Sequence, residues 1–356
     1  MISHLFCIFA EKYFMERNSN IESYRILATF AVLVFHFNGW LAGGMPKHFD
    51  VDHLSVYRIT QALIESFSVI CVNMFLVISG YFGIHFKWQS FLRICLLLVS
   101  IYIPFYVVDC IFFNETFSTK ELVRRFMVIS NGGYFIQCYL MLMFLSPVIN
   151  SFIEKYGKSG LKWCGFFLFV EFWFDCVTHV EFIGFNHGYS VIHFILIYML
   201  ARYISLYREV LLRYKKWWWA VGYMLCSFII FLMYVMDINY VWQYSNPVAV
   251  VSSVCSFIPF LYRHYVNNWV NWVAQSTLAV YIIHVTVPVY HLVVRYDTYI
   301  LYHYDYPTYL LMALGGILFI FLACILYDKI RLVFTNPIFS FIVKFVEAHK
   351  NGKSST

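Results

Sequence analysis

The chain has 356 residues, of which 62% are hydrophobic, 22% aromatic and only 12% charged. Because a soluble domain of this length carries about twice that charged fraction, the composition excludes an ordinary soluble enzyme. The net charge of +6 is no argument for nucleic-acid binding, and we attribute it to basic loops that lie against an anionic cytoplasmic membrane surface.

Residues 1–10 (MISHLFCIFA) are apolar, but they lack the basic start and the small-residue cleavage site of a signal peptide. We expect residues 1–20 to form a cytoplasmic segment with a short interfacial or disordered start.

Apolar runs of about 20 residues then recur along the chain, as in polytopic helical membrane proteins. The ten predicted spans are 21–41, 60–82, 91–112, 133–153, 161–177, 190–207, 217–237, 245–263, 275–296 and 307–333. No internal repeat or linker divides them, so the predicted fold is all-α: one ten-helix membrane domain over 21–333.

The Lys and Arg residues predict the orientation of these spans. With a cytoplasmic N-terminus, the inner side holds 19 of the 25 Lys and Arg residues and the outer loops hold 6. Positive charge favours the cytoplasmic side, so both termini are predicted to be cytoplasmic. The tail, 334–356, could form an amphipathic helix on the inner surface.

The remaining motifs are weak. None of the ten cysteines forms a C-x-x-C pair, so we interpret them as small packing residues. The histidines are not spaced as metal ligands, and no glycine pair has the spacing of a phosphate loop. We therefore predict no metal and no nucleotide loop.

Ionisable groups inside the first span are more informative. A charge at membrane depth costs about 2.5–3.5 kcal/mol on insertion scales. Arg25 and His36 lie eleven residues apart, which in a helix places them within about 20° of one face and about 16 Å apart. Glu22, one turn before Arg25, can pair with it. Arginine suits a phosphate-bearing donor and neutral histidine can take a proton from a hydroxyl. The alternative is a snorkelling arginine and a hydrogen-bonded core histidine.

A second histidine lies in the ninth predicted span. The segment STLAVYIIH (276–284) places Tyr281 and His284 one turn apart. Tyr281 could orient His284 or donate to a substrate, although a core histidine with a satisfied hydrogen bond has the same pattern.

Other buried polar residues are less specific. Glu65, Glu171, Asp175 and His193 fall inside predicted spans and could line a cavity, with structural pairing as the alternative. Glu171 and Asp175 are four residues apart and would repel each other if both were ionised.

Three segments, in order, resemble signatures of the membrane acyltransferase family 3, the polysaccharide O-acyltransferase type. They are SYRILATFAVLVFHF with Arg25 and His36, NMFLVISGYF (73–82) with Ser79 and Gly80, and STLAVYIIH with Tyr281 and His284. The resemblance covers about residues 20 to 330.

The resemblance implies an enzyme of the inner (plasma) membrane that takes an acyl group, usually acetyl, from cytoplasmic acyl-CoA as co-substrate. The acceptor is a hydroxyl of a cell-surface or lipid-linked carbohydrate. His36 would be the essential residue, and Arg25 would act in catalysis or donor binding. Many members carry Arg-x-Arg at the start of the third helix, where FKWQSFLRICL (86–96) offers only Lys87 and Arg93. We carry the donor role to these two residues.

In the predicted mechanism, His36 takes the acceptor proton, or first accepts the acyl group itself. Tyr281, His284 and Asn73 are candidates for orienting the base or the developing oxyanion, and Glu22 and Ser79 for orienting roles. The partners are acyl-CoA, a carbohydrate and the bilayer, not nucleic acid. Two rivals remain: a transporter or flippase of lipid-linked saccharides, and a membrane subunit without activity.

Overall fold

The computed structural model describes residues 18–40, 48–49, 55–113, 115–126, 133–178, 184–239 and 241–353. Over these residues the chain is helical and contains no strand, as the predicted all-α fold requires. The expectations for residues 1–17, including the interfacial or disordered start, lie outside the described residues.

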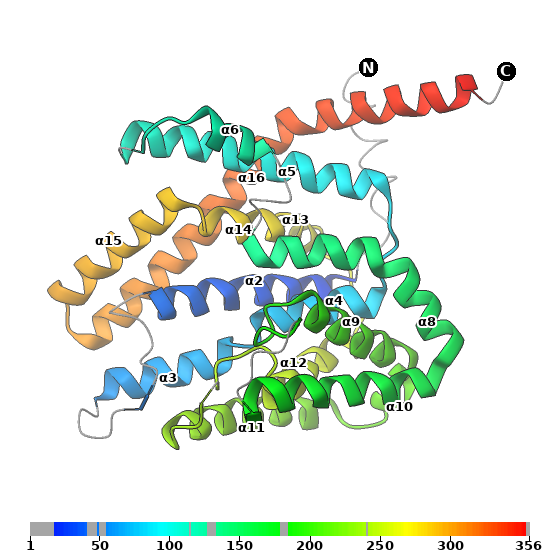
Figure 1. Ribbon diagram of the computed structural model, residues 1–356. Coiled ribbons are helices and arrows are strands. Elements are labelled where there is room, and N and C mark those ends of the chain that lie inside the picture. Colours follow the sequence, from blue (N-terminus) through cyan, green and yellow to red (C-terminus); the bar gives the residue numbers. More distant parts are fainter. Residues whose placement is uncertain are drawn as a thin grey trace.

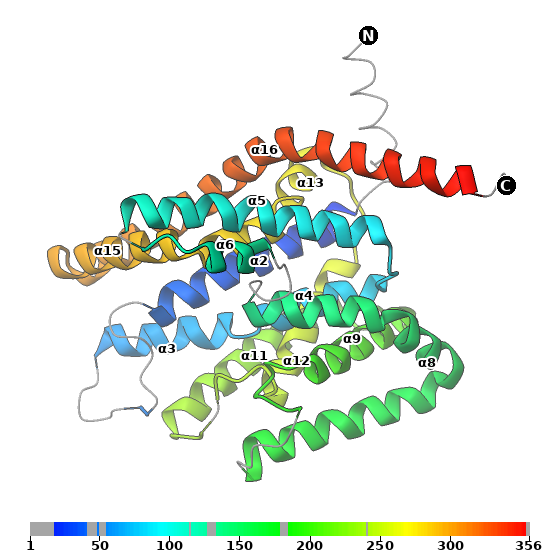
Figure 2. The same ribbon diagram turned by 45° about the horizontal axis from the view of Figure 1, so that its top comes forward.

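Helix α2 (Ser19–Trp40) lies at the centre of the fold (Figures 1 and 2). It separates a layer that contains α5 (Trp88–Phe112), α15 (Val287–His303) and α16 (Tyr306–Lys353) from the remaining long helices. Those helices are α3 (Val56–Ser68), α4 (Cys71–Phe82), α8 (Gly133–Phe172), α9 (Val191–Leu206), α11 (Lys216–Val235) and α12 (Pro247–Phe257). We call the two ends of the bundle the Ser19 end and the Trp40 end, after the ends of α2.

Short elements complete the chain: α6 (Thr119–Phe126), the π-helical turn η1 (Trp173–Thr178), α10 (Arg208–Leu211), the 3-10 turn η2 (Ile258–Leu261), α13 (Asn268–Ala274) and α14 (Thr277–His284). At the Ser19 end, α13 is tied to α2 because the Ser19 hydroxyl donates to Asn271 Oδ1 at 2.9 Å. At the Trp40 end, α3 is tied to α2 because Asn38 Nδ2 donates to Glu65 Oε2 at 2.6 Å.

The long helices are apolar because their outer faces meet lipid rather than water. By length and composition, 5 helices of the described chain could cross a membrane, or up to 6 if the bent pair Asn268–His284 and Val287–His303 is one span. Each predicted span overlaps at least one helix of the described residues. The count of ten crossings and the cytoplasmic termini stay predictions.

The helices of the structure differ from the predicted spans in two places. Spans 133–153 and 161–177 are the two legs of α8, which turns at Gly157, where φ is 47°; glycine adopts this conformation without a steric penalty. Span 275–296 is not one helix. It breaks after His284 and bends by 80°, because the ring of Pro288 would clash with the carbonyl four residues earlier, that of His284.

The predicted tail, 334–356, continues α16 without interruption as far as Lys353, and the figures show this part extending beyond the bundle. All nine cysteines of the described chain are free thiols, and five of them are buried, as expected for packing residues.

Gly80 of α4 lies at a close contact with helix α9. A Cβ at this position would lie 2.4 Å from the backbone oxygen of Tyr198 and 2.6 Å from the Cβ of Ala201 on α9. The glycine of the NMFLVISGYF segment therefore allows α4 and α9 to pack backbone to backbone.

We predict that Gly80→Ala destabilises the protein by about 1–3 kcal/mol, because α4 and α9 must separate to admit the methyl group. The control is Gly165→Ala on α8, where an added Cβ meets nothing within 4 Å and should be neutral or slightly stabilising. The measurement is thermal unfolding of both variants in detergent; equal midpoints would contradict the packing argument.

Candidate functional site

His36 and His284 meet where α2 passes α14. The Nδ1 atom of His36 lies 2.7 Å from the Nε2 atom of His284, and the two rings stack at 5.0 Å between centroids with 26° between their planes. The two histidines, 248 residues apart in sequence, therefore form one hydrogen-bonded pair. Sequence analysis selected both residues but did not predict that they touch.

The backbone of α14 sets the tautomers of this pair. His284 Nδ1 lies 3.0 Å from the carbonyl oxygen of Val280. A carbonyl only accepts, so His284 Nδ1 carries the hydrogen and its Nε2 is the acceptor when the ring is neutral. Nδ1–H of His36 then donates to His284, and the lone pair of neutral His36 is on Nε2. This is the form of imidazole that can act as a base or as a nucleophile.

The pair borders a small apolar recess. His284 is 3% exposed and His36 is half-buried. The recess, which we call the His recess, is small, with a cavity volume of about 10 Å³, and its lining residues are Leu33, His36, Phe37, His284, Val293, Ile317 and Ile320. Apart from the two imidazoles it is hydrophobic, so it strengthens the electrostatic effect of any polar group that enters.

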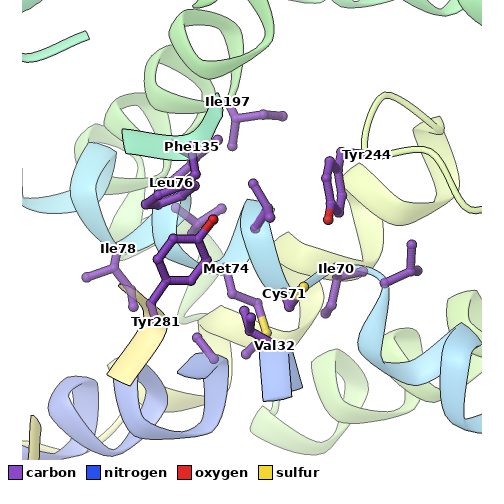
Figure 3. Close-up of a cluster of buried hydrophobic side chains, with 14 of the residues drawn as sticks. Val32, Ile70, Cys71, Met74, Leu76, Ile78, Phe135, Ile197, Tyr244 and Tyr281 are labelled. Atoms are coloured by element: carbon purple, nitrogen blue, oxygen red, sulfur yellow. The ribbon is translucent and has the colours of Figure 1, made fainter. Parts of the chain in front are cut away.

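Tyr281 packs beside the pair, one turn before His284 on α14. Its ring meets the ring of His284 edge-on at 5.8 Å and that of Phe135 at 4.7 Å. Figure 3 shows the Tyr281 ring next to Phe135, with the hydroxyl at the end turned away from α14. His284 is oriented by Val280 and His36, and Tyr281 adds only an edge contact.

Arg25 and Glu22 form the predicted ion pair at the Ser19 end of α2. Arg25 Nε lies 3.2 Å from Glu22 Oε2, and the arginine side chain is 33% exposed. Eleven residues of helix separate Arg25 from His36, which corresponds to about 16 Å. Arg25 does not line the His recess.

A larger recess opens at the Ser19 end between α5, α14 and α16. We call it the Arg recess. It has a cavity volume of about 190 Å³, and its polar lining consists of Arg93, Gln275, Asp328, Arg331, Thr335 and Asn336. Arg331 Nη2 contacts Asp328 Oδ1 at 2.6 Å, and the Arg93 guanidinium lies over the Phe339 ring at 4.0 Å. Two arginines and one aspartate give this recess a net positive charge.

The Arg recess contains one of the two residues that were predicted to bind the acyl-CoA donor near the start of α5. Arg93 lines it, whereas Lys87 is exposed and lines neither recess. Sequence analysis missed Arg331, Gln275 and Asn336. The available signal was weak: Arg331 is one of many basic residues near the end of the last predicted span.

Asn73 belongs to a buried polar network rather than to either recess. Its Nδ2 donates to the backbone oxygen of Tyr244 at 3.0 Å, so its Oδ1 accepts from His193 Nε2 at 2.9 Å. His193 Nδ1 lies 3.0 Å from Glu171 Oε2. His193 and Glu171 are 0% and 1% exposed, so this carboxylate–imidazole pair is the structural pairing that the sequence left open.

The other predicted polar residues also have local partners. The Ser79 hydroxyl donates to the Phe75 carbonyl one turn earlier at 2.9 Å. Asp175 accepts from the Ser245 hydroxyl at 2.8 Å. Glu65 accepts from Asn38. None of the three lines the His recess or the Arg recess.

Comparison with known proteins identifies the family. Searches among curated proteins and among solved structures found no match. The sequence model of acyltransferase family 3, described as an acyltransferase domain, matches residues 18–329. This match includes α2, the NMFLVISGYF segment of α4 and α14, where the sequence resemblance was found. The chain belongs to acyltransferase family 3.

Proposed function

We propose that the protein is an integral membrane O-acyltransferase that moves an acyl group, in the first instance acetyl, from cytoplasmic acyl-CoA to a hydroxyl of a cell-surface or lipid-linked carbohydrate. Family membership supports an acyltransferase. The observation that carries the proposal is the His36–His284 pair, in which neutral His36 donates through Nδ1 and carries its lone pair on Nε2.

In the direct route, His36 Nε2 removes the proton of the acceptor hydroxyl as its oxygen attacks the thioester carbonyl. The new C–O bond forms, the C–S bond breaks, and the CoA thiolate takes the proton back from His36. As His36 becomes cationic, His284 Nε2 accepts its Nδ1–H bond and stabilises the charge. In the relay route, His36 Nε2 attacks the thioester carbonyl first, the C–S bond breaks and CoA leaves as the thiolate. The acceptor hydroxyl oxygen then attacks the acyl-imidazole, the C–N bond breaks, and the hydroxyl proton passes through the released imidazole to the thiolate.

The Arg recess supports a binding site for the acyl-CoA donor at the Ser19 end. Arg93 and Arg331 would neutralise part of the phosphate charge of CoA. Helix α16 lines both recesses, and Ile320 in the His recess is eight residues from Asp328 in the Arg recess, which corresponds to about 12 Å of helix. An extended pantetheine arm can cover that distance along α14 and α16.

The charge asymmetry of the sequence supports the same orientation. With the Ser19 end in the cytoplasm, the Arg recess faces the compartment that contains acyl-CoA, and His36 lies towards the opposite end. We place the protein in the inner (plasma) membrane on this basis. Arg25, on the same end of α2, would add to the positive field at the donor entrance.

His36→Ala should reduce transfer of label from radiolabelled acetyl-CoA to saccharide by about 10²–10⁴-fold, the usual contribution of a general base. Membranes that contain the variant at wild-type level are compared with wild type and with His291→Ala, a control at an exposed histidine of α15. Wild-type transfer by the His36 variant would rule out the assigned role. Saccharide movement across vesicles without acyl transfer would favour a transporter.

Arg93→Ala should raise the acetyl-CoA concentration needed for half-maximal transfer by about 10-fold, because a charged hydrogen bond to phosphate is lost. Arg25→Ala should act in the same direction, and Lys87→Ala should have the smallest effect of the three. The control is Arg213→Ala, an exposed arginine of the same half of the bundle. An unchanged donor requirement in Arg93→Ala would contradict a donor site in the Arg recess.

A further inference from the structure

Three tyrosines from separate parts of the chain are linked by ring contacts, and a fourth, Tyr281, packs against His284 of the histidine pair. They are Tyr134 at the start of α8, Tyr189 before α9, Tyr244 before α12 and Tyr281 on α14. The rings of Tyr134 and Tyr189 lie 4.7 Å apart, and those of Tyr189 and Tyr244 lie 4.9 Å apart. We call this group the tyrosine cluster.

The phenols of the cluster lie close together, because the rings of Tyr134 and Tyr244 both pack against Tyr189. Figure 3 shows the Tyr281 and Tyr244 rings standing apart, with part of the α4 ribbon between them. A phenol group can donate and accept, so the cluster combines several hydroxyls with flat apolar faces.

The tyrosine cluster is connected to the histidine pair by aromatic contacts. The Tyr281 ring meets the His284 ring at 5.8 Å. Phe35 lies 6.4 Å from Tyr244 and 6.0 Å from His36. Tyr134 and Tyr189 are half-buried, whereas Tyr244 is 2% exposed. The rings therefore run from an accessible rim towards the pair.

The backbone around the cluster is held firmly. Gly188 has φ of 88°, and a Cβ there would lie 2.5 Å from the Cβ of Tyr244. The Tyr244 carbonyl accepts from the buried Asn73, and the next residue, Ser245, donates to Asp175. These contacts fix the loops that carry Tyr189 and Tyr244, which lowers the entropy that a ligand would lose on binding.

We propose that the tyrosine cluster is the acceptor subsite and takes a cyclic sugar with neighbouring free hydroxyls. This inference rests on the proposed acyltransferase function. The apolar C–H face of a sugar ring packs on aromatic rings, and its hydroxyls exchange hydrogen bonds with the phenols. A sugar bound there would approach His36 from the Trp40 end, while the thioester approaches from the Ser19 end.

The experiment measures acceptor and donor requirements separately. Membranes that contain the full-length protein receive radiolabelled acetyl-CoA and one of two probes from the producing cell, each first stripped of esters by mild alkali. One probe is the organic extract with lipid-linked saccharides, and the other is the water-soluble polysaccharide. Transfer to one probe alone identifies the source of the sugar.

Tyr134→Ala and Tyr189→Ala should each raise the amount of acceptor needed for half-maximal transfer by about 3- to 10-fold, with the acetyl-CoA requirement unchanged. Tyr189→Phe keeps the ring face and should show a smaller rise. The control is Tyr302→Ala on α15, whose side chain is 80% exposed. An unchanged donor requirement also shows that the variants are folded.

Two negative results have different meanings. If wild-type protein shows no His36-dependent transfer to either probe, the proposed function fails and the subsite with it. If wild type transfers and the Tyr134 and Tyr189 variants need no more acceptor than wild type, only the assignment of the tyrosine cluster is overturned.

Discussion

The hydrogen bond between His36 and His284 connects the first helix of the domain to a short helix near its end, and the candidate site depends on it. The bond forms because α14 passes α2 near the Trp40 end and because the Val280 carbonyl holds the His284 ring with Nε2 towards His36. A backbone carbonyl cannot change its role as an acceptor. The Val280 carbonyl of α14 therefore determines which atom donates and which accepts in both hydrogen bonds, Val280–His284 and His284–His36.

The surroundings of this pair differ on its two sides. Towards the Ser19 end, α14 and α16 lead to the Arg recess, where positive charge gathers around Arg93 and Arg331. In the tyrosine cluster, the polar groups are neutral phenol hydroxyls. Such a division suits a reaction between an anionic reactant and an uncharged one, with the imidazole between them. The buried Glu171–His193–Asn73 network lies behind the tyrosines and supports the loop of Tyr244.

The two main departures from the predicted spans have backbone causes. Pro288 ends α14 at His284, so the histidine lies at a helix end where the chain bends by 80° instead of in mid-span. Gly157 reverses α8 and brings Glu171 on its second leg against His193 on α9. Proline breaks the helix because its ring clashes with the preceding turn, and glycine permits the sharp turn because it has no side chain.

The sequence by itself determined the all-helical membrane class, because lipid requires long apolar helices whose backbone bonds are internal. It also selected His36, His284 and Arg25, since ionisable groups in apolar runs are costly and stand out, and the family resemblance added Arg93. Only the tertiary structure decided which of these groups meet. Contacts such as His36 to His284, Arg93 to Phe339 and Tyr189 to Tyr244 join residues far apart in the chain. They depend on how helices pack and where they bend, which local periodicity does not encode.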